Sequence, residues 1–109
     1  MKIHVEIFIA SRILGKNQTS FSPEDLIRFI KKEFGDSRPG IMTHATAVCV
    51  ANAHLNHAIG YNYLWRSGHA DLRPFRPGID IPDPEREKHQ TQPKIEDMPD
   101  KYRHLIQRN

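Results

Sequence analysis

Apolar residues recur at helical spacing over the first part of the chain. Four of them share one side of a helix: Ile3, Ile7, Ala10 and Leu14. In the same stretch, every second residue from position 3 to position 9 is apolar, which is the period of a strand. We predict a helix over residues 3–14 because the helical pattern continues beyond the alternating part. The run GKN at positions 15–17, with its leading glycine, is expected to end that helix.

A second helix is predicted over residues 22–34, within the segment SPEDLIRFIKKEFG. Ser22 is a good N-cap, Pro23 suits the first helical position, and Asp25 stands where a capping box needs its acceptor. Gly35 is expected to end the helix. The short segment TSF before it, residues 19–21, is compatible with a strand. The buried stripe would consist of Leu26, Ile27, Ile30 and Phe34.

After a turn over residues 36–40, we predict a third helix over about residues 41–53. Its inward positions would be Ile41, Ala45, Val48 and Cys49. Its outward positions would be Thr43, Thr46, Ala47 and Val50, with His44 at the edge. Two strand-like segments follow, residues 61–66 and 71–75, joined by a turn that contains glycine. Together these two segments predict an antiparallel hairpin.

The chain changes character from Arg76 onward. Residues 76–99 contain five prolines and many charges, so we expect this stretch to bury little and to form an extended tail or a wrapping arm. Residues 98–109 can form one short helix, with Tyr102, Leu105 and Ile106 as its apolar side. The pattern therefore divides the chain into a folded part, residues 1–77, and a proline-rich charged tail, residues 78–109.

Composition narrows the class of protein. A length of 109 residues fits one domain, and the hydrophobic share of 38% and charged share of 27% are ordinary for a soluble protein. No apolar run approaches the roughly 20 residues that cross a membrane. Polar residues interrupt the apolar N-terminal segment, so we expect no signal peptide. A single cysteine cannot form an internal disulfide, which favours a cytoplasmic location.

The net charge of +3 is unevenly distributed along the chain. Residues 1–78 contain ten Lys and Arg against six Asp and Glu, whereas residues 79–109 contain six against seven. The positive excess lies in the predicted folded part. This distribution mildly favours a nucleic-acid partner, although an ordinary soluble surface has the same appearance.

The predicted order is helix, short strand, helix, turn, helix and hairpin, and it resembles a winged helix-turn-helix domain. The resemblance covers residues 1 to about 77. It rests on FSPEDLIRFIKKEFG as the second helix, GIMTHATAVCVANA in the recognition position and YNYLWRSGHADLRPF as the wing. The third helix and the YLWRSG strand are also similar to a group of uncharacterised prokaryotic winged-helix domains, some of which occur beside restriction-type nucleases. The chain departs from a minimal winged helix in its longer turn before the third helix and in its tail.

The resemblance implies an α+β fold of three helices and a small antiparallel hairpin. It also implies double-stranded DNA as the partner, and a role as a transcriptional regulator or as the DNA-recognition part of a defence system. The third helix would enter the major groove, where small side chains fit and threonine and alanine methyls can contact thymine. The arginines beside the hairpin would hold phosphates. The candidate DNA-contacting residues are Arg38, Thr43, His44, Thr46, Ala47, Arg66, His69, Arg73 and Arg76.

Two features speak against this DNA-binding hypothesis. The third helix contains no Lys or Arg. Arg66 and Arg73 are also typical of a solvated strand, and a winged helix serves equally well as a protein-interaction module. In that alternative, the aromatic residues of the hairpin region would form an exposed face that pairs with a second copy or another protein, as could the tail. These residues are Tyr61, Tyr63, Trp65 and Phe75, and packing in the core or base stacking are their other interpretations.

Metal binding and catalysis are weaker alternatives. His44, Cys49, His54 and His57 offer suitable ligand atoms for zinc. However, positions 44 and 49 lie about 140° apart around a helix and do not share a face. A Cys–His catalytic pair needs an accessible thiolate, whereas Cys49 is expected to be buried. We therefore expect no metal, no cofactor and no catalytic residue, with His54 and His57 as hydrated loop residues.

Overall fold

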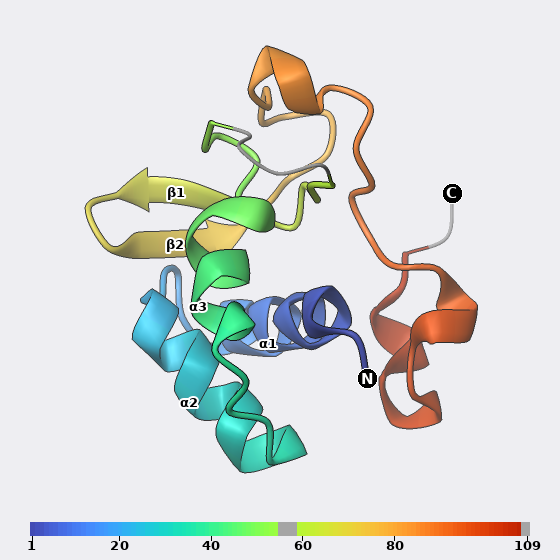
Figure 1. Cartoon of the computed structure of the whole chain (residues 1–109). Helices are drawn as coiled ribbons and strands as arrows, with labels where there is room; N and C mark the ends of the chain where they lie inside the picture. Colours follow the sequence, from blue (N-terminus) through green and yellow to red (C-terminus); the bar gives the residue numbers. More distant parts are fainter. Residues whose placement is uncertain (55–58, 108–109) are drawn as a thin grey trace.

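The computed structural model describes residues 1–54 and 59–107 (Figure 1). Its helices are α1 (Ile3–Asn17), α2 (Pro23–Phe34) and α3 (Gly40–Thr43), which continues directly into the π-helical turn η1 (His44–Val48). Strands β1 (Leu64–Gly68) and β2 (Asp71–Pro74) form an antiparallel hairpin. Three short 3₁₀-helices follow: η2 (Pro84–Arg86), η3 (Ile95–Asp97) and η4 (Asp100–Leu105). The predicted α+β class and its two-stranded hairpin are confirmed.

Helix α1 lies at the centre of the molecule (Figure 1). All residues from position 4 to position 11 are buried, which is more than two helical turns. A helix covered on every side has no single apolar stripe, so its sequence also fits the alternation of a strand. The predicted helix is confirmed, but it continues to Asn17 instead of ending at the glycine.

Gly15 has a different role from the one that its sequence context predicts. A Cβ atom at this position would lie 2.6 Å from Cγ of Pro74. The glycine therefore allows α1 and β2 to approach closely inside a continuing helix, and Gln18 follows as the C-cap.

Helix α2 agrees with its prediction in detail. Ser22 Oγ accepts a hydrogen bond of 3.1 Å from the backbone N–H of Asp25, and the Asp25 carboxylate accepts one of 2.9 Å from Ser22 N–H. This reciprocal pair is a capping box. Gly35 takes a left-handed conformation with φ of 66° and ends the helix. Leu26 and Ile30 are fully buried against the core.

The third helix is shorter than predicted. Its regular part ends with Thr43, and the N–H of Cys49 donates to the carbonyl oxygen of His44 five residues earlier, which closes a wide π-type turn. The chain then leaves the helix, and Val50 forms a parallel bridge with Leu64. Val50 is therefore fully buried, and its predicted outward position is wrong.

The hairpin is joined to the segment before α2. Phe21 and Leu72 exchange two backbone hydrogen bonds of 2.9 and 2.8 Å, so the predicted short strand contributes a third, one-residue partner to the hairpin. The first strand begins at Leu64 rather than at residue 61. Tyr61 and Tyr63 instead donate their backbone N–H groups to Val48 and Cys49. These bonds place the hairpin against the end of η1.

Residues 76–99 are mostly exposed or half-buried, as expected, but Arg86, Pro93 and Met98 within this stretch are buried. Met98, Tyr102 and Leu105 belong to the same hydrophobic cluster as the helices, and Arg86 is fully buried. The last part of the chain packs beside the N-terminal half of α1 (Figure 1). The predicted terminal helix corresponds to η4, and Lys101 within it pairs at 3.0 Å with the Glu33 carboxylate of α2. The division of the chain at residue 77 stays a prediction.

Candidate nucleic-acid interface

The end of the α3–η1 helix is fastened to the hairpin through Arg66. The Arg66 guanidinium donates a hydrogen bond of 2.7 Å to the carbonyl oxygen of Thr46. The side-chain amide of Asn52 bonds both backbone polar groups of Arg66, each at 2.8 Å. Helix and hairpin therefore present one joined surface. We call it the α3–wing face, and it consists of Met42, Thr43, Thr46, Asn52 and Arg66.

The candidate DNA-contacting residues of α3 and η1 differ in exposure and in the hydrogen bonds that they already form. Thr43 is exposed, and its hydroxyl group forms no hydrogen bond within the described residues, so it can donate to or accept from a ligand. Thr46 donates its hydroxyl proton to the carbonyl oxygen of Met42 at 2.8 Å. Its methyl group and the lone pairs of its hydroxyl oxygen are left for contact with a ligand. His44 is half-buried and its Nδ1 lies 2.9 Å from the Gly40 carbonyl oxygen. Ala47 is also half-buried. Thr46 is half-buried as well, so Thr43 is the best-placed of these side chains for contact.

Arg66 and Arg73 lie on opposite faces of the hairpin. In the hairpin register Arg66 lies opposite Leu72, whereas Arg73 lies opposite Trp65, the residue before Arg66. Successive side chains of a strand point to opposite faces, so these two arginines cannot act on one ligand as a pair. Arg73 also forms two hydrogen bonds of 2.8 Å with the Asp80 carboxylate. This contact lowers the pKa of Asp80 and neutralises the charge of Arg73 within the fold.

The remaining candidate residues in the hairpin region, His69 and Arg76, are exposed. His69 is exposed at the tip of the hairpin. Arg76 donates its backbone N–H to Asp80 at 2.8 Å, while its side chain lines a surface cleft beside the end of α1. The structure therefore separates the predicted set: Thr43, Thr46 and Arg66 share the α3–wing face, whereas Arg73 and Arg76 belong to the cleft side of the hairpin.

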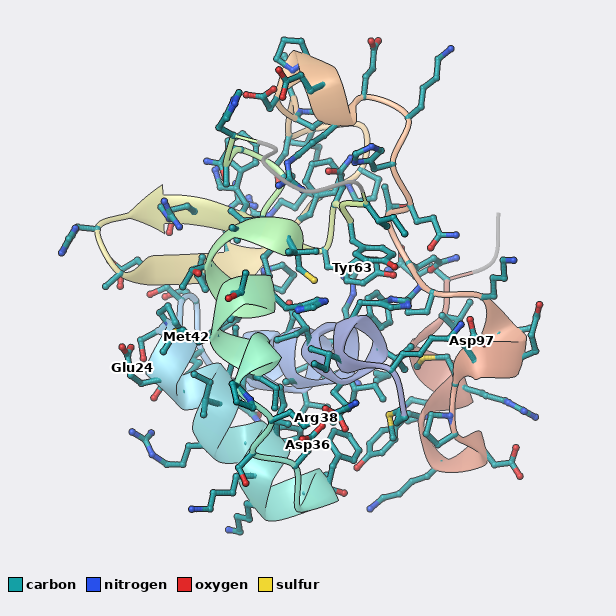
Figure 2. All side chains as sticks on the ribbon, viewed as in Figure 1. Glu24, Asp36, Arg38, Met42, Tyr63 and Asp97 are labelled. Carbon is teal, nitrogen blue, oxygen red and sulfur yellow. The ribbon has the colours of Figure 1, made fainter. Side chains whose placement is uncertain are left out.

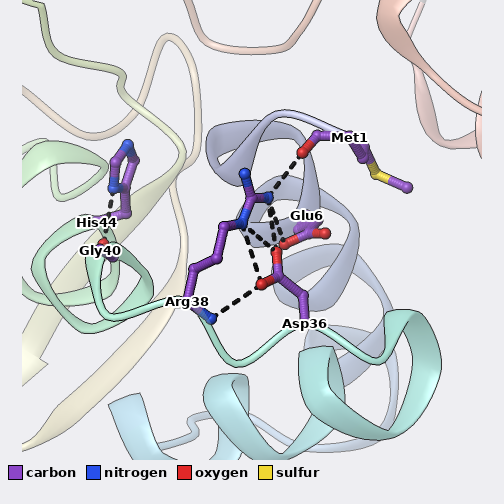
Figure 3. Close-up of polar contacts among 6 residues, drawn as sticks. All are labelled: Met1, Glu6, Asp36, Arg38, Gly40 and His44. Carbon is purple, nitrogen blue, oxygen red and sulfur yellow. Dashed lines mark hydrogen bonds and ion pairs between the residues drawn. The ribbon is translucent and has the colours of Figure 1, made fainter.

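Arg38 is held by acidic neighbours (Figure 3). Its guanidinium bonds Asp36 at 2.6 Å, donates to the Met1 carbonyl oxygen at 2.7 Å, and lies 3.8 Å from Glu6 Oε2. The Arg38 guanidinium lowers the pKa of Asp36. Burial, followed by hydrogen bonding to Asp36, raises the pKa of Glu6 to about 7. Two carboxyl groups beside Arg38 make it a poor phosphate ligand.

Tyr61 and Tyr63 pack against α1 rather than forming an open face. Tyr63 is buried in the interior (Figure 2), where its hydroxyl group lies 2.9 Å from Nδ1 of His4. Tyr61 stacks on the His4 ring at 4.1 Å between centroids. Burial, followed by the charge of Lys2, lowers the pKa of His4 to about 4, so the ring is neutral at pH 7. Trp65 lies beside the buried Phe75.

Within residues 43–54, the histidine and cysteine side chains do not gather into a metal site. Cys49 is fully buried, and burial raises the pKa of its thiol, which excludes it as a nucleophile. His54 is exposed and lies 3.7 Å from Glu85. His57 lies outside the described residues. Among residues 1–54 and 59–107, no three His, Cys, Asp or Glu side chains come close enough to share a metal ion.

Comparisons with known proteins add no assignment. No family model, curated protein or solved structure matches the chain. Within residues 1–54 and 59–107, every helix is too short or too polar to traverse a lipid bilayer. The functional proposal therefore depends on the residues and their geometry.

Several important residues were not identifiable as such from the sequence pattern. Asn52 accepts a hydrogen bond from the backbone N–H of Arg66 and so positions it. Arg86, which lies far along the chain, donates a hydrogen bond to the Ala47 carbonyl oxygen in η1. Arg12 and Lys16 line the same cleft as Arg76. Only Arg12 carries a local signal, because it stands close to the apolar residues Ala10, Ile13 and Leu14 of α1. The roles of Asn52 and Arg86 depend on contacts with residues far along the chain.

Proposed function

We propose that the protein is a non-catalytic winged-helix module that binds double-stranded DNA through the α3–wing face. The bond between the Arg66 guanidinium and the Thr46 carbonyl oxygen carries this proposal, because it unites the helix and the hairpin in one surface. A preorganised surface loses less conformational freedom when it binds. Roles as a transcriptional regulator or as the DNA-recognition part of a defence system fit such a module.

The arrangement of elements supports the winged-helix assignment. The Phe21–Leu72 bridge joins the segment between α1 and α2 to the hairpin, and α3–η1 packs beside α1 and α2. In the proposed complex, the Thr43 and Thr46 methyl groups contact thymine methyls in the major groove. Arg66 and His69 approach phosphates. Asn52 has both amide atoms engaged with the Arg66 backbone, so it positions the hairpin rather than reading a base.

Fluorescence anisotropy with a labelled mixed-sequence duplex tests the proposal over a salt series from about 50 to 200 mM. We expect binding that weakens steeply with salt. Thr43→Glu places a negative charge on the exposed α3 surface and is expected to weaken binding about tenfold or more. Arg66→Gln is expected to weaken binding and to reduce the salt slope by about 1.

Lys31→Gln is the matched control, because Lys31 is exposed near the C-terminal end of α2 and its loss also removes one positive charge. We expect this variant to bind within about twofold of wild type, since it retains the α3–wing face. Absence of binding at low salt would contradict the proposal. Equal losses in Thr43→Glu and Lys31→Gln would show that the contact is not at α3.

Exposed isoleucines favour a second candidate function, a protein-interaction module. Ile79 and Ile81 are 72% and 83% exposed and flank Asp80, whose carboxylate is fixed by Arg73. Fixed, exposed apolar side chains are typical of contact surfaces. Size-exclusion chromatography of wild type and of an Ile79→Ser/Ile81→Ser variant tests this candidate. A concentration-dependent dimer that the double variant abolishes would support it, whereas a monomer at all concentrations argues against self-association.

A further inference from the structure

We propose that a cleft between the C-terminal end of α1 and strand β2 binds a phosphate group. The cleft has a volume of about 590 Å³, within the range of small-ligand sites. Arg12, Lys16, Arg73 and Arg76 contribute to its lining, and every other lining residue is neutral. It lies on the side of the hairpin that carries Arg73, opposite Arg66, so it is separate from the α3–wing face.

Arg12 is the central cation of this region. It lines the main cleft and two smaller hollows that adjoin it. Its guanidinium lies over the Phe8 ring at 5.3 Å and is half-buried. Within the described part of the chain, no carboxylate oxygen lies within 4 Å of it. Burial of the guanidinium lowers the pKa of Arg12, because its charge has lost part of its hydration.

Lys16 and Arg76 add two exposed cations to the lining. Neither side chain forms an ion pair within residues 1–54 and 59–107. Arg73 differs, because Asp80 neutralises it through two hydrogen bonds. Asp80 itself is not part of the lining and is nearly buried. Among residues 1–54 and 59–107, Arg12, Lys16 and Arg76 line the cleft without an ion-pair partner, and none of the lining residues is acidic, which favours a multiply charged anion.

The walls of the cleft are fixed before any ligand binds. Gly15 permits the close approach of α1 to Pro74, which forms one side. Gln107 forms part of another side and is held by Gln92 through two hydrogen bonds of 2.8 and 3.0 Å. A preformed cleft binds a ligand with a smaller entropic cost. Guanidinium groups suit phosphate in particular, because their N–H donors match its oxygen atoms.

The phosphate could belong to a nucleic-acid backbone or to a small phosphorylated molecule, and the two sources share the same chemistry. Isothermal titration with inorganic pyrophosphate probes the free group, and anisotropy with the mixed-sequence duplex probes the backbone. The variants are Arg12→Gln and the double variant Lys16→Gln/Arg76→Gln, both in the full chain. The double variant changes only exposed side chains, so it keeps the test valid if Arg12→Gln does not fold. Lys31→Gln/Lys32→Gln is the matched control, because it removes two charges from α2.

We expect the double cleft variant to lose about tenfold or more of the affinity for one probe, while the control loses less than about twofold. A loss for pyrophosphate identifies a site for a free phosphorylated ligand. A loss for duplex alone, with a salt slope reduced by about 2, identifies a backbone contact. Arg66→Gln leaves pyrophosphate binding unchanged, so this inference and the proposed α3–wing contact can fail independently. If neither probe distinguishes the cleft variant from the control, the inference is wrong.

Discussion

The Arg86 guanidinium donates a hydrogen bond of 2.7 Å to the carbonyl oxygen of Ala47, 39 residues earlier in the chain. The same group donates to the Val48 carbonyl at 2.9 Å and to the Ala53 carbonyl at 2.9 Å. At the end of η1 this fully buried cation adds hydrogen bonds to carbonyl groups that also accept from the backbone N–H groups of Val50 and Tyr61. Arg86 therefore holds the end of η1 and, with it, the α3–wing face.

Arg86→Met tests this role, because methionine fills similar space without hydrogen-bond donors. We expect the free energy of unfolding to fall by about 3–5 kcal/mol, since the carbonyl groups of Ala47, Val48 and Ala53 each lose a hydrogen bond from the guanidinium. Urea denaturation followed by circular dichroism measures this change. Arg76→Met is the control and should change stability by less than about 0.5 kcal/mol, because Arg76 is exposed. Equal stability of the two variants would contradict a capping role.

Gly15→Ala should destabilise the protein although alanine is the better helix former. The helix gains about 1 kcal/mol from its higher propensity, but the new Cβ would collide with Cγ of Pro74 at 2.6 Å. We expect a net loss of about 1–3 kcal/mol in thermal or urea unfolding. Pro74→Ala removes the colliding Cγ and Cδ atoms. The Gly15→Ala/Pro74→Ala double variant should therefore be at least as stable as the Pro74→Ala single variant. A Gly15→Ala protein as stable as wild type would show that α1 and β2 separate without cost.

Glu6 and His4 have opposing effects on the pH dependence of stability. The pKa of Glu6 is raised from 4.5 to about 7, so the folded state keeps a proton that the unfolded state has lost, and stability falls as the pH rises through this range. The pKa of His4 is lowered from 6.5 to about 4, so the unfolded state holds the extra proton and stability rises with pH. Between about pH 4.5 and 6.5 the two contributions oppose each other.

Glu6→Gln removes the contribution of Glu6 to the pH dependence of stability and leaves that of His4. We expect the variant to gain stability relative to wild type by about 1–3 kcal/mol when the pH rises from about 4.5 to 7.5. Its own stability should rise between about pH 4 and 6.5, because His4 is then unopposed. Urea midpoints at several pH values measure both effects. A constant difference between variant and wild type across this range would show that Glu6 titrates normally in the folded protein.

Arg73 is expected to matter for stability more than for a DNA contact on the α3–wing face. Arg73→Gln leaves the Asp80 carboxylate, whose side chain is only 6% exposed, without its cationic partner. We expect a loss of about 2–4 kcal/mol in urea unfolding. Asp80→Asn in the same background should recover part of it, because the buried charge is removed. If Arg73→Gln instead weakens duplex binding at unchanged stability, the assignment of Arg73 to the fold is wrong.

Local signals predicted α2 well, because its cap, stripe and stop all lie within residues 22–35. They failed where a residue serves a distant contact. Gly15 stands inside α1 because of Pro74, and η1 ends early because Val50 pairs with Leu64. Arg86 belongs to a stretch whose composition indicates an exposed tail, and its burial is explained by distant carbonyl groups, those of Ala47, Val48 and Ala53, which accept its hydrogen bonds.

The candidate site was predicted in part. The outward position of Thr43 follows from helical periodicity and is confirmed. The arginines could not be ranked from the sequence alone, because their availability depends on nearby carboxylates. Asp36 stands two residues before Arg38, but Asp80 reaches Arg73 only through the fold of the intervening loop. The cleft around Arg12 requires α1, β2 and Gln107 to be brought together, which no local pattern indicates.

The position of α1 at the centre of the molecule has a consequence during synthesis on the ribosome. Helix α1 is synthesised well before Met98, Tyr102 and Leu105, which join its hydrophobic cluster. Contacts between residues so far apart in sequence slow folding, and apolar surface that waits for its cover is prone to aggregate. The apolar surface of α1 therefore stays uncovered on the nascent chain until residues 98–105 have emerged, and slow translation of that region would prolong the risk of aggregation.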